Sequence, residues 1–381
     1  MDRRPLCPQC SGVMKRNGVT SAGRTRWRCK DTQCGVSKTR RNNTESVGLS
    51  QFLSWLFSKE TQAQTSVGAA RTFRDLAARY WPYWPLPHYV DLPVTVLHVD
   101  GLHLRRKAVV LISSNEHGRP VGWYLARSEH SSAWRALLDQ TGKPLMIVTD
   151  GGAGFRKALR GKWRDVRVQR CLFHVYGNIT KHTSKNPKLA PGRELKELGL
   201  QLLRVHTLEG SFEWEQAYLA WEDRWAEFLS EQSIYADGAL ADTHQKLVAA
   251  RGLLRRHLRE GELFTFLDPK LVEASGLGAL PSTNNRLEGG INAQLRRMLD
   301  YHRGMPLLHR AKAIFWWCYT HSPEPMPPAR ILKVMPTDDT IEGLYAQARA
   351  ATGEARRQAL GVPARWGTVI SWEDLHHKTW H

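Results

Sequence analysis

The segment of residues 94–182 most constrains the fold, because its apolar residues follow two different periods in succession. Three runs in which apolar and polar residues tend to alternate predict consecutive β-strands, at 94–101, 106–114 and 121–128. Helix and strand patterns then alternate over 130–142, 145–152, 153–163, 166–171 and 172–182. A run of strands followed by alternating helices and strands predicts an α/β fold with a mixed sheet.

Two aspartates occupy the ends of predicted strands. Asp100 ends the first strand and Asp150 ends the fourth, and a glycine follows each of them. Ligands and catalytic groups collect at strand ends in sheets of this kind. If the two strands are parallel neighbours, the two carboxylates lie side by side and repel each other unless a cation lies between them. Mg²⁺ suits such a place, and a third carboxylate, for which Glu288 is the candidate, would complete a two-metal site.

The segment around Glu288, PSTNNRLEGGINAQLRR at residues 281–297, is open to two interpretations. Asn285 is a suitable N-cap for a helix that has Glu288 as its third residue, as in a capping box. The pair Gly289-Gly290 argues for more than a helix start, because each glycine inside a helix costs about 1 kcal/mol relative to alanine. In the second interpretation Glu288 is a metal ligand and the glycines let a ligand come close to the backbone.

Four of the six cysteines lie within the first 34 residues, in two pairs spaced as in a zinc site: Cys7, Cys10, Cys29 and Cys34. A segment this short needs a stabilising cross-link to fold, and one structural Zn²⁺ ion supplies it. Residues 1–42 are therefore predicted to be a zinc ribbon. The residues between the two pairs predict a basic hairpin that contacts the DNA backbone through Arg24, Arg26 and Arg28.

The charge of the chain points to the same kind of partner. A net charge of +19 and an isoelectric point near 9.9 predict a polyanionic ligand. Helical periodicity on both sides of a break near Thr61 predicts a helix-turn-helix at 43–82, with Arg71 and Arg74 facing DNA, although any small helical bundle gives a similar pattern. The sequence has no apolar run of membrane-spanning length and no signal-peptide core, which predicts a cytoplasmic protein without a membrane partner.

Residues 183–280 give no strand pattern, and we expect an all-helical insertion there. Its Trp214, Trp221 and Trp225 share one predicted helix face, where core packing is favoured over stacking on nucleic acid. Residues 281–322 are expected to return to the α/β core with its last helix. Residues 323–381 form a C-terminal tail for which the sequence suggests no function.

The order of these features resembles a bacterial insertion-sequence transposase of the DDE type, related to the Mutator superfamily. The resemblance covers residues 93–322 and rests mainly on two motifs. One is the C-x-x-H of Cys171 and His174, within QRCLFHVYGNI. The other is T-N-N-x-x-E-x-x-x-N-x-x-L-R, from Thr283 to Arg296.

The resemblance implies an RNase H-like catalytic core, formed by residues 91–182 and 281–322 and interrupted by the insertion. It implies that Asp100, Asp150 and Glu288 bind two Mg²⁺ ions, for which Mn²⁺ is a substitute. It also implies that the protein nicks DNA at the element ends and then transfers the strand that carries the released 3′-hydroxyl.

The resemblance further implies that Cys171 and His174 lie close to the three carboxylates. Of these two, we expect His174 to contact the scissile phosphate or a neighbouring carboxylate, and Cys171 to be packed. Around Glu288 we expect side chains that orient the backbone or DNA or steer phosphate: Asn284, Asn285, Asn292 and Arg286.

The sequence as a whole predicts a transposase that binds the terminal inverted repeats of its insertion sequence, and target DNA, as a homodimer or larger assembly at the bacterial nucleoid. Two alternatives stay open. An RNase H-like nuclease or resolvase without strand transfer would differ only in its products. A transposase-derived DNA-binding regulator would have no chemistry, and the intact carboxylate triad argues against it.

Overall fold

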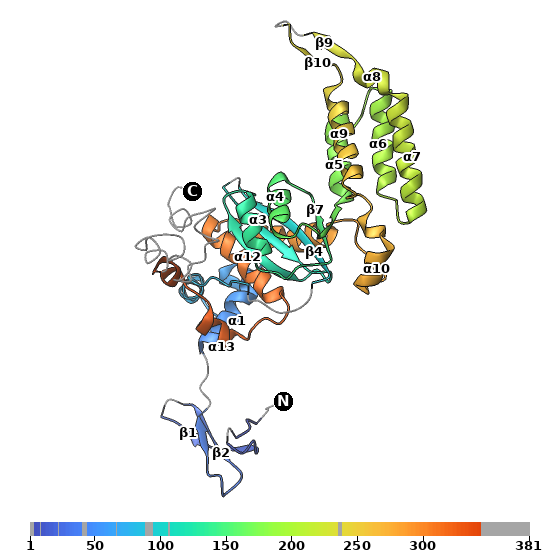
Figure 1. The fold of residues 1–381 in the computed structure, drawn as a ribbon. Coiled ribbons are helices and arrows are strands. Elements are labelled where there is room, and N and C mark those ends of the chain that lie inside the picture. Colours follow the sequence, from blue (N-terminus) through green and yellow to red (C-terminus); the bar gives the residue numbers. More distant parts are fainter. Residues whose placement is uncertain are drawn as a thin grey trace, which may run out of the picture.

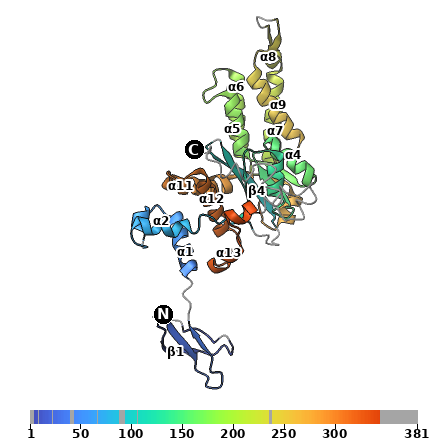
Figure 2. The ribbon, with the colours of Figure 1, turned by 90° about the vertical axis from the view of Figure 1, so that its left-hand side faces the viewer.

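A computed structural model describes residues 4–343 of the chain, except 8, 22, 40–43, 66, 88–93, 106 and 235–237. Figures 1 and 2 show a small N-terminal sheet, a central sheet with helices on both faces, and a helical arm that extends away from the sheet. Most of the expected C-terminal tail, residues 344–381, lies outside the described residues.

The N-terminal segment forms an antiparallel sheet of three strands in chain order: β1 (Met14–Val19), β2 (Thr25–Cys29) and β3 (Ser37–Thr39). Trp27 and Cys29 of β2 are buried in a small core with Cys7 and Met14. The arginines on either side of Trp27 are exposed. Because successive side chains of a strand point to opposite faces, β2 places its cysteine inside and its basic residues outside.

The central sheet has five strands in the order β6-β5-β4-β7-β8. Their bounds are β4 (Val96–Leu104), β5 (Ala108–Ser114), β6 (Pro120–Ala126), β7 (Met146–Thr149) and β8 (Arg167–Arg170). The first three form an antiparallel meander, and β7 and β8 run parallel to β4. The predicted α/β fold with a mixed sheet is confirmed.

Each face of the sheet has its own core, because side chains along β5 alternate between the two faces. Val109 and Leu111 pack with α3 (Ser131–Leu138) and α4 (Ala153–Lys162). Val110 and Ile112 pack with α11 (Ala293–Tyr301) and α12 (Leu307–His321) on the other face. All seven residues of β5 are buried, as expected of a strand that is covered on both sides.

The two helices that precede the sheet, α1 (Thr44–Leu56) and α2 (Ala70–Ala78), belong to the same core as α12. Phe52 of α1 meets Trp316 of α12 edge to face, with ring centroids 6.2 Å apart. Between α1 and α2 lies a 3₁₀ turn, Gln62–Gln64, and α13 (Pro328–Val334) contacts α1. The segment expected to form a helix-turn-helix therefore packs against the last helices of the chain.

After β8, α5 (Leu172–Thr183) leads into the helical arm (Figure 1). The arm contains α6 (Ala190–Leu202), α7 (Leu208–Arg224), α8 (Ala226–Ser230), α9 (Gln245–Arg259), the 3₁₀ helix η2 (Thr265–Leu267) and α10 (Pro269–Ser275). Trp214 and Trp221 of α7 are buried, and their indole N–H groups donate to backbone oxygens of α6 at 2.8 and 3.0 Å. Trp225 is partly buried against the same core. The prediction that the tryptophans pack in the core is confirmed.

The expectation of a wholly helical insertion is wrong in one detail. β9 (Gln232–Ile234) and β10 (Leu240–Asp242) pair as an antiparallel hairpin near the tip of the arm. Each strand has only three residues, and both have exposed positions along their length. Strands this short and exposed leave no period-two pattern in the sequence, so sequence analysis missed them.

Candidate active site

Asp100 and Asp150 lie on neighbouring parallel strands. In the pairing of β4 with β7, His98 is opposite Val148, and the same offset puts Asp100 opposite Asp150. Asp150 follows β7 directly, and its Oδ1 accepts a hydrogen bond of 3.2 Å from the backbone N–H of Gly152. The prediction that Asp100 ends its strand is wrong, because β4 continues to Leu104 and Asp100 lies in its middle. The shorter β7 ends at the same level, so the pairing still lets the two carboxylates lie side by side.

Glu288 lies on η3 (Arg286–Asn292), a π-helical segment that contacts β4 and continues into α11. Its Oε1 is 3.3 Å from His174 Nδ1 and 3.9 Å from Cys171 Sγ. π-helical turns are rare in proteins, but those that occur inside longer helices are often found at functional sites. The sequence pattern had indicated an ordinary helix start, so the π-helical geometry is a finding of the structure.

The capping interpretation of this segment fails in its details. Asn285 does precede the first residue of η3, but its side chain makes no capping hydrogen bond. The backbone N–H groups of Leu287 and Glu288 both donate to Asn284 O instead, each at 2.9 Å. A Cβ at Gly289 would lie 2.4 Å from Asn285 Oδ1, so this glycine makes room for Asn285. Gly290 has nothing within 4 Å of such a position and borders open space.

Two buried asparagines connect η3 to β4. Asn284 donates to Val99 O at 2.9 Å, and its Oδ1 is 3.1 Å from Nδ1 of His98, whose pKa burial lowers to about 4. Asn292 donates from Nδ2 to Asp100 Oδ2 at 2.6 Å. Both asparagines are fully buried. They fix the segment that carries Glu288 against the strand that carries Asp100.

The charges of two of the carboxylates change the pKa of the third and of a neighbouring histidine. The pKa of Asp100 is raised to about 6, chiefly by burial and then by the negative charges of Glu288 and Asp150. The pKa of His174 is raised to about 9, first by a hydrogen bond with the Cys171 side chain and further by the charges of Glu288 and Asp150. His174 is therefore a cation at neutral pH beside a group of anions.

Cys171 does more than fill space. It is buried at the start of α5, and its Sγ accepts a hydrogen bond of 3.2 Å from the backbone N–H of Asn284. Its ligand atom and those of His174 and Glu288 all lie within 4.8 Å of one another. Among the described residues, Asp100 and Asp150 belong to no such tight group.

Sequence analysis missed Glu129, which precedes α3 at the same edge of the sheet. A Cβ at Gly101 would lie 2.4 Å from its Oε1, and a Cβ at Gly154 would lie 2.0 Å from its backbone oxygen. Burial and the charge of Asp150 both raise the pKa of Glu129. Its only ion-pair partner among the described residues is His103, at 3.0 Å. The sequence could have indicated the position of Glu129 only through the order of the strands. Because β6 runs parallel to β4, the residues that follow β6 lie at the same end of the sheet as the end of β4.

The residues expected to contact DNA are all exposed: Arg24, Arg26 and Arg28 around β2, Arg71 and Arg74 on α2, and Arg286 on η3. Within the described part of the chain, none of the six forms an ion pair with a carboxylate. These side chains are free to meet phosphate, and their contact with DNA stays a prediction.

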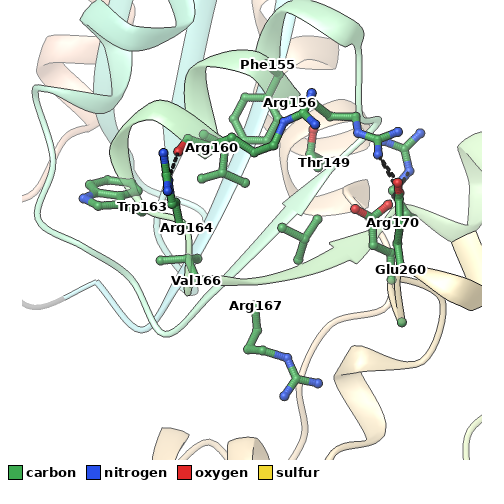
Figure 3. A pocket seen from close by; sticks show the side chains of 14 residues that line it. Thr149, Phe155, Arg156, Arg160, Trp163, Arg164, Val166, Arg167, Arg170 and Glu260 are labelled. Atoms are coloured by element: carbon green, nitrogen blue, oxygen red, sulfur yellow. Dashed lines mark hydrogen bonds and ion pairs between the residues drawn. The ribbon is translucent and has the colours of Figure 1, made fainter.

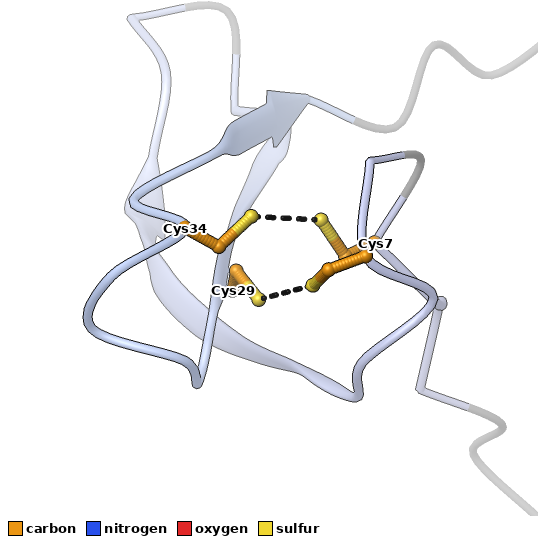
Figure 4. Close-up of side chains that lie close together, drawn as sticks. Cys7, Cys29 and Cys34 are labelled. Atoms are coloured by element: carbon orange, nitrogen blue, oxygen red, sulfur yellow. Dashed lines mark hydrogen bonds between the residues drawn. The ribbon is translucent and has the colours of Figure 1, made fainter.

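The four N-terminal cysteines meet in one cluster (Figure 4). Cys7 Sγ is 3.6 Å from Cys34 Sγ, and Cys10 Sγ is 3.5 Å from Cys29 Sγ. All four sulfur atoms lie within 4.8 Å of one another, and the cysteines are free thiols. Sulfur atoms about 2.3 Å from a tetrahedral Zn²⁺ are about 3.8 Å apart, close to these separations. The cluster can hold a metal ion such as zinc, which agrees with the predicted zinc ribbon.

Comparison with known protein families shows a resemblance over part of the chain. Residues 100–227 match the model of the Mutator family of transposases, a segment that begins at Asp100 and runs through Asp150, Cys171 and His174 into the arm. A search of curated proteins found no match. No helix among the described residues is long and apolar enough to cross a membrane. Over these residues, which end before Glu288, the chain is similar to the transposases of the Mutator family.

Proposed function

We propose that this transposase cuts DNA and transfers the cut strand, with Asp100, Asp150 and Glu288 as the ligands of two Mg²⁺ ions, for which Mn²⁺ substitutes. The observation that carries the proposal is the meeting of these carboxylates from three separate elements at one end of the sheet. The raised pKa of Asp100 supports this arrangement, because the charges of both other carboxylates contribute to it.

The donor groups suit a hard divalent cation, because Mg²⁺ prefers oxygen ligands. Asn292 supports this choice: it is fully buried and donates to Asp100, yet its Oδ1 has no hydrogen-bond partner among the described residues. A buried acceptor without a partner costs free energy, and a cation-bound water would satisfy it. Bound Mg²⁺ would supply Lewis acidity for the attacking and leaving oxygens of the phosphodiester.

The protein's own side chains would hold the DNA strand in place. His174 is cationic at neutral pH, and its side chain is 37% exposed beside Glu288, so it is placed to contact a phosphate oxygen. Asn292 holds the Asp100 carboxylate in one orientation through their 2.6 Å hydrogen bond.

The exposed arginines of the ribbon and α2, together with Arg286, would bind the terminal inverted repeats and target DNA, since phosphate contacts give most of the affinity of such proteins. A homodimer or larger assembly would bring two element ends together in the bacterial cytoplasm, at the nucleoid. The zinc held by the four cysteines would be structural, because all four positions around it would be occupied by protein ligands.

The test is a Mg²⁺-dependent cleavage assay on the ends of the element, with wild type, Asp150→Asn and Glu288→Gln. Loss of a metal ligand removes several kcal/mol of transition-state stabilisation, so we expect both variants to bind DNA normally and to cut it at least about a hundredfold more slowly. Asp165→Asn is the matched control, because Asp165 pairs with Lys143 away from the site and is exposed. If Asp150→Asn cuts as well as wild type, the assignment of the triad is wrong.

The products of the same assay separate the alternatives. Joining of the cut strand to a second duplex supports a transposase with strand transfer. Hydrolysis without joining would indicate a nuclease or resolvase. Tight binding of the ends by wild type without any cleavage would indicate a DNA-binding regulator.

A further inference from the structure

A second basic surface lies on the other side of β7 and β8 from the carboxylates. A cavity of about 390 Å³ opens between α4, β8 and the loop at residues 260–262 (Figure 3). Five arginines line it, against two glutamates: Arg156, Arg160, Arg164, Arg167 and Arg170. Neither the family match nor the predicted DNA contacts give this pocket a role.

Three of these arginines come from α4 and the turn that follows it. Arg156 and Arg160 are four residues apart on α4, where like charges destabilise a helix, and Arg164 lies in the turn beyond the last helical residue, Lys162. Arg156 is neutralised by Glu260, at 2.5 Å. Arg160 and Arg164 are exposed, and neither forms an ion pair within the described residues. The Nε of Arg164 donates to Arg160 O at 3.4 Å, and the charges of both side chains remain available to an anion bound in the cavity.

Arg170 connects the pocket to the candidate active site. It is only 4% exposed, and its Nε and Nη1 have no hydrogen-bond partner among the described residues; Glu262 lies 3.9 Å away. A Cβ at Gly151 would lie 0.6 Å from Arg170 Nη1, so the guanidinium occupies the space beside the residue that follows Asp150. Thr149, which precedes Asp150, also lines the cavity. The pocket therefore begins within two residues of a proposed metal ligand.

The rest of the lining suits a nucleotide. Trp163 is half-buried at the rim, and Leu159 and Val166 form an apolar wall beside it. Arginines combined with an aromatic ring bind single strands of nucleic acid, because phosphates meet the charges and bases or sugars meet the ring. The volume lies within the range of small-ligand sites, so one or two nucleotides fit.

We propose that this pocket binds the phosphodiester backbone of the DNA strand that passes Asp150, with Arg160 and Arg164 on its phosphates and Trp163 beside a base or sugar. The inference rests on the proposed function, because it takes the strand at Asp150 to be DNA. It assigns the DNA a path around the edge of the sheet, from the carboxylates to the outer face of β8.

The test uses the full chain in EDTA, so that no strand is cut, and a 30-nucleotide single strand of arbitrary sequence with photoreactive phosphates. We expect cross-links that mass spectrometry maps to residues 153–170. In Arg160→Gln/Arg164→Gln these cross-links disappear while those to the ribbon remain. The slope of log affinity against log salt falls by about 1.4, because each single-strand phosphate contact contributes about 0.7. Both side chains are exposed, so the circular dichroism spectrum and melting temperature stay unchanged.

Arg204→Gln/Arg330→Gln removes the same charge from exposed positions on the arm and α13 and is the matched control. It should keep the cross-links to 153–170. The inference is overturned if wild type gives no cross-link there, if the pocket variant keeps the wild-type slope, or if a free deoxynucleotide at equal concentration removes the cross-links. Cleavage of element ends without these cross-links would refute the inference alone. Cross-links without cleavage would refute the proposed function and leave the pocket as a DNA site.

Discussion

Replacement of Glu129 by glutamine should stabilise the metal-free protein and weaken its binding of divalent cations. The side chain is a half-buried carboxylate at the same end of the sheet as Asp150, and the charge of Asp150 raises the pKa of Glu129. Glutamine has almost the same shape but no charge, so the substitution removes repulsion without opening a cavity. A cation that is held by these carboxylates would lose one negative neighbour at the same time.

The size of the effect follows from the geometry around Gly152. A Cβ at Gly152 would lie 3.9 Å from Glu129 Oε2 and 4.0 Å from Asp150 Oδ1, so these two oxygens are at most about 8 Å apart. Two unit charges at this separation repel by about 2 kcal/mol at an effective dielectric constant of about 20, and by about 0.5 kcal/mol in bulk water. The lost ion pair with His103 offsets little, because His103 is 63% exposed and exposed pairs contribute about 0–1 kcal/mol. We expect a net gain of about 1 kcal/mol in the free energy of unfolding.

The assay is thermal unfolding of wild type and Glu129→Gln in EDTA and again over a series of Mn²⁺ concentrations. The variant should melt higher in EDTA and gain less from the metal, so the two curves cross. Calorimetry should give a Mn²⁺ affinity about five- to thirtyfold lower, the factor that corresponds to 1–2 kcal/mol. Glu213→Gln, an exposed glutamate on α7, should behave as wild type. A variant that melts lower in EDTA, or that gains as much from Mn²⁺ as wild type, would refute the reasoning.

Three further predictions follow from the titratable groups. Cys7→Ser should reduce bound zinc, measured by metal analysis, from about one per chain to none, because a Cys₄ site needs all its thiolates; a full equivalent that remains would point to a second site at Cys171. Asp338→Ala should lower the free energy of unfolding, measured by urea denaturation, by about 3 kcal/mol, because the buried Lys312 loses the carboxylate that lies 2.6 Å from its Nζ; an unchanged unfolding midpoint would contradict this. Mn²⁺ affinity should fall as pH drops below about 6, where Asp100 takes up a proton; a flat calorimetric profile would argue against Asp100 as a ligand. The stability of the metal-free protein is not the readout, because protonation of Asp100 contributes stability between pH 6 and 4 while His98 and His309, whose pKa values burial lowers to about 4, oppose it in the same range.

The sequence revealed those parts of the site that depend on local pattern. Asp100 and Asp150 each end a run of apolar residues, and strand ends can be read from the chain without knowledge of its partners. The cysteine pairs were equally visible, because ligand spacing along the chain restricts the geometry of a zinc site. The inference about the aspartates needed one long-range assumption, namely that β4 and β7 are parallel neighbours. The structure pairs them in this way.

Features that depend on two distant segments were not visible. Glu129 owes its place to Gly101 and Gly154, which lie 28 residues before it and 25 after it and leave room for it. Asn285 looked like a helix cap because its neighbours fit a capping box, but its side chain instead fills the space beside Gly289. In each case the glycine and the side chain that it accommodates are separate residues of the sequence. The sequence does not show that a given glycine makes room for a given side chain.

The position of Glu288 depends on how the arm returns to the sheet, since 138 residues separate it from Asp150. The returning chain is fixed to β8: Arg170 donates its backbone N–H to Glu262 O at 2.8 Å, and the Gln169 side chain bonds both Leu263 O and Phe266 N. A second junction follows at the start of α5, where the Leu172 N–H donates to Ser282 O at 3.1 Å. The arm therefore leaves the sheet and rejoins it at adjacent residues of the same strand end. Because both junctions lie beside Cys171, the segment that begins at Asn284 enters the site from a fixed point, whatever the length of the arm.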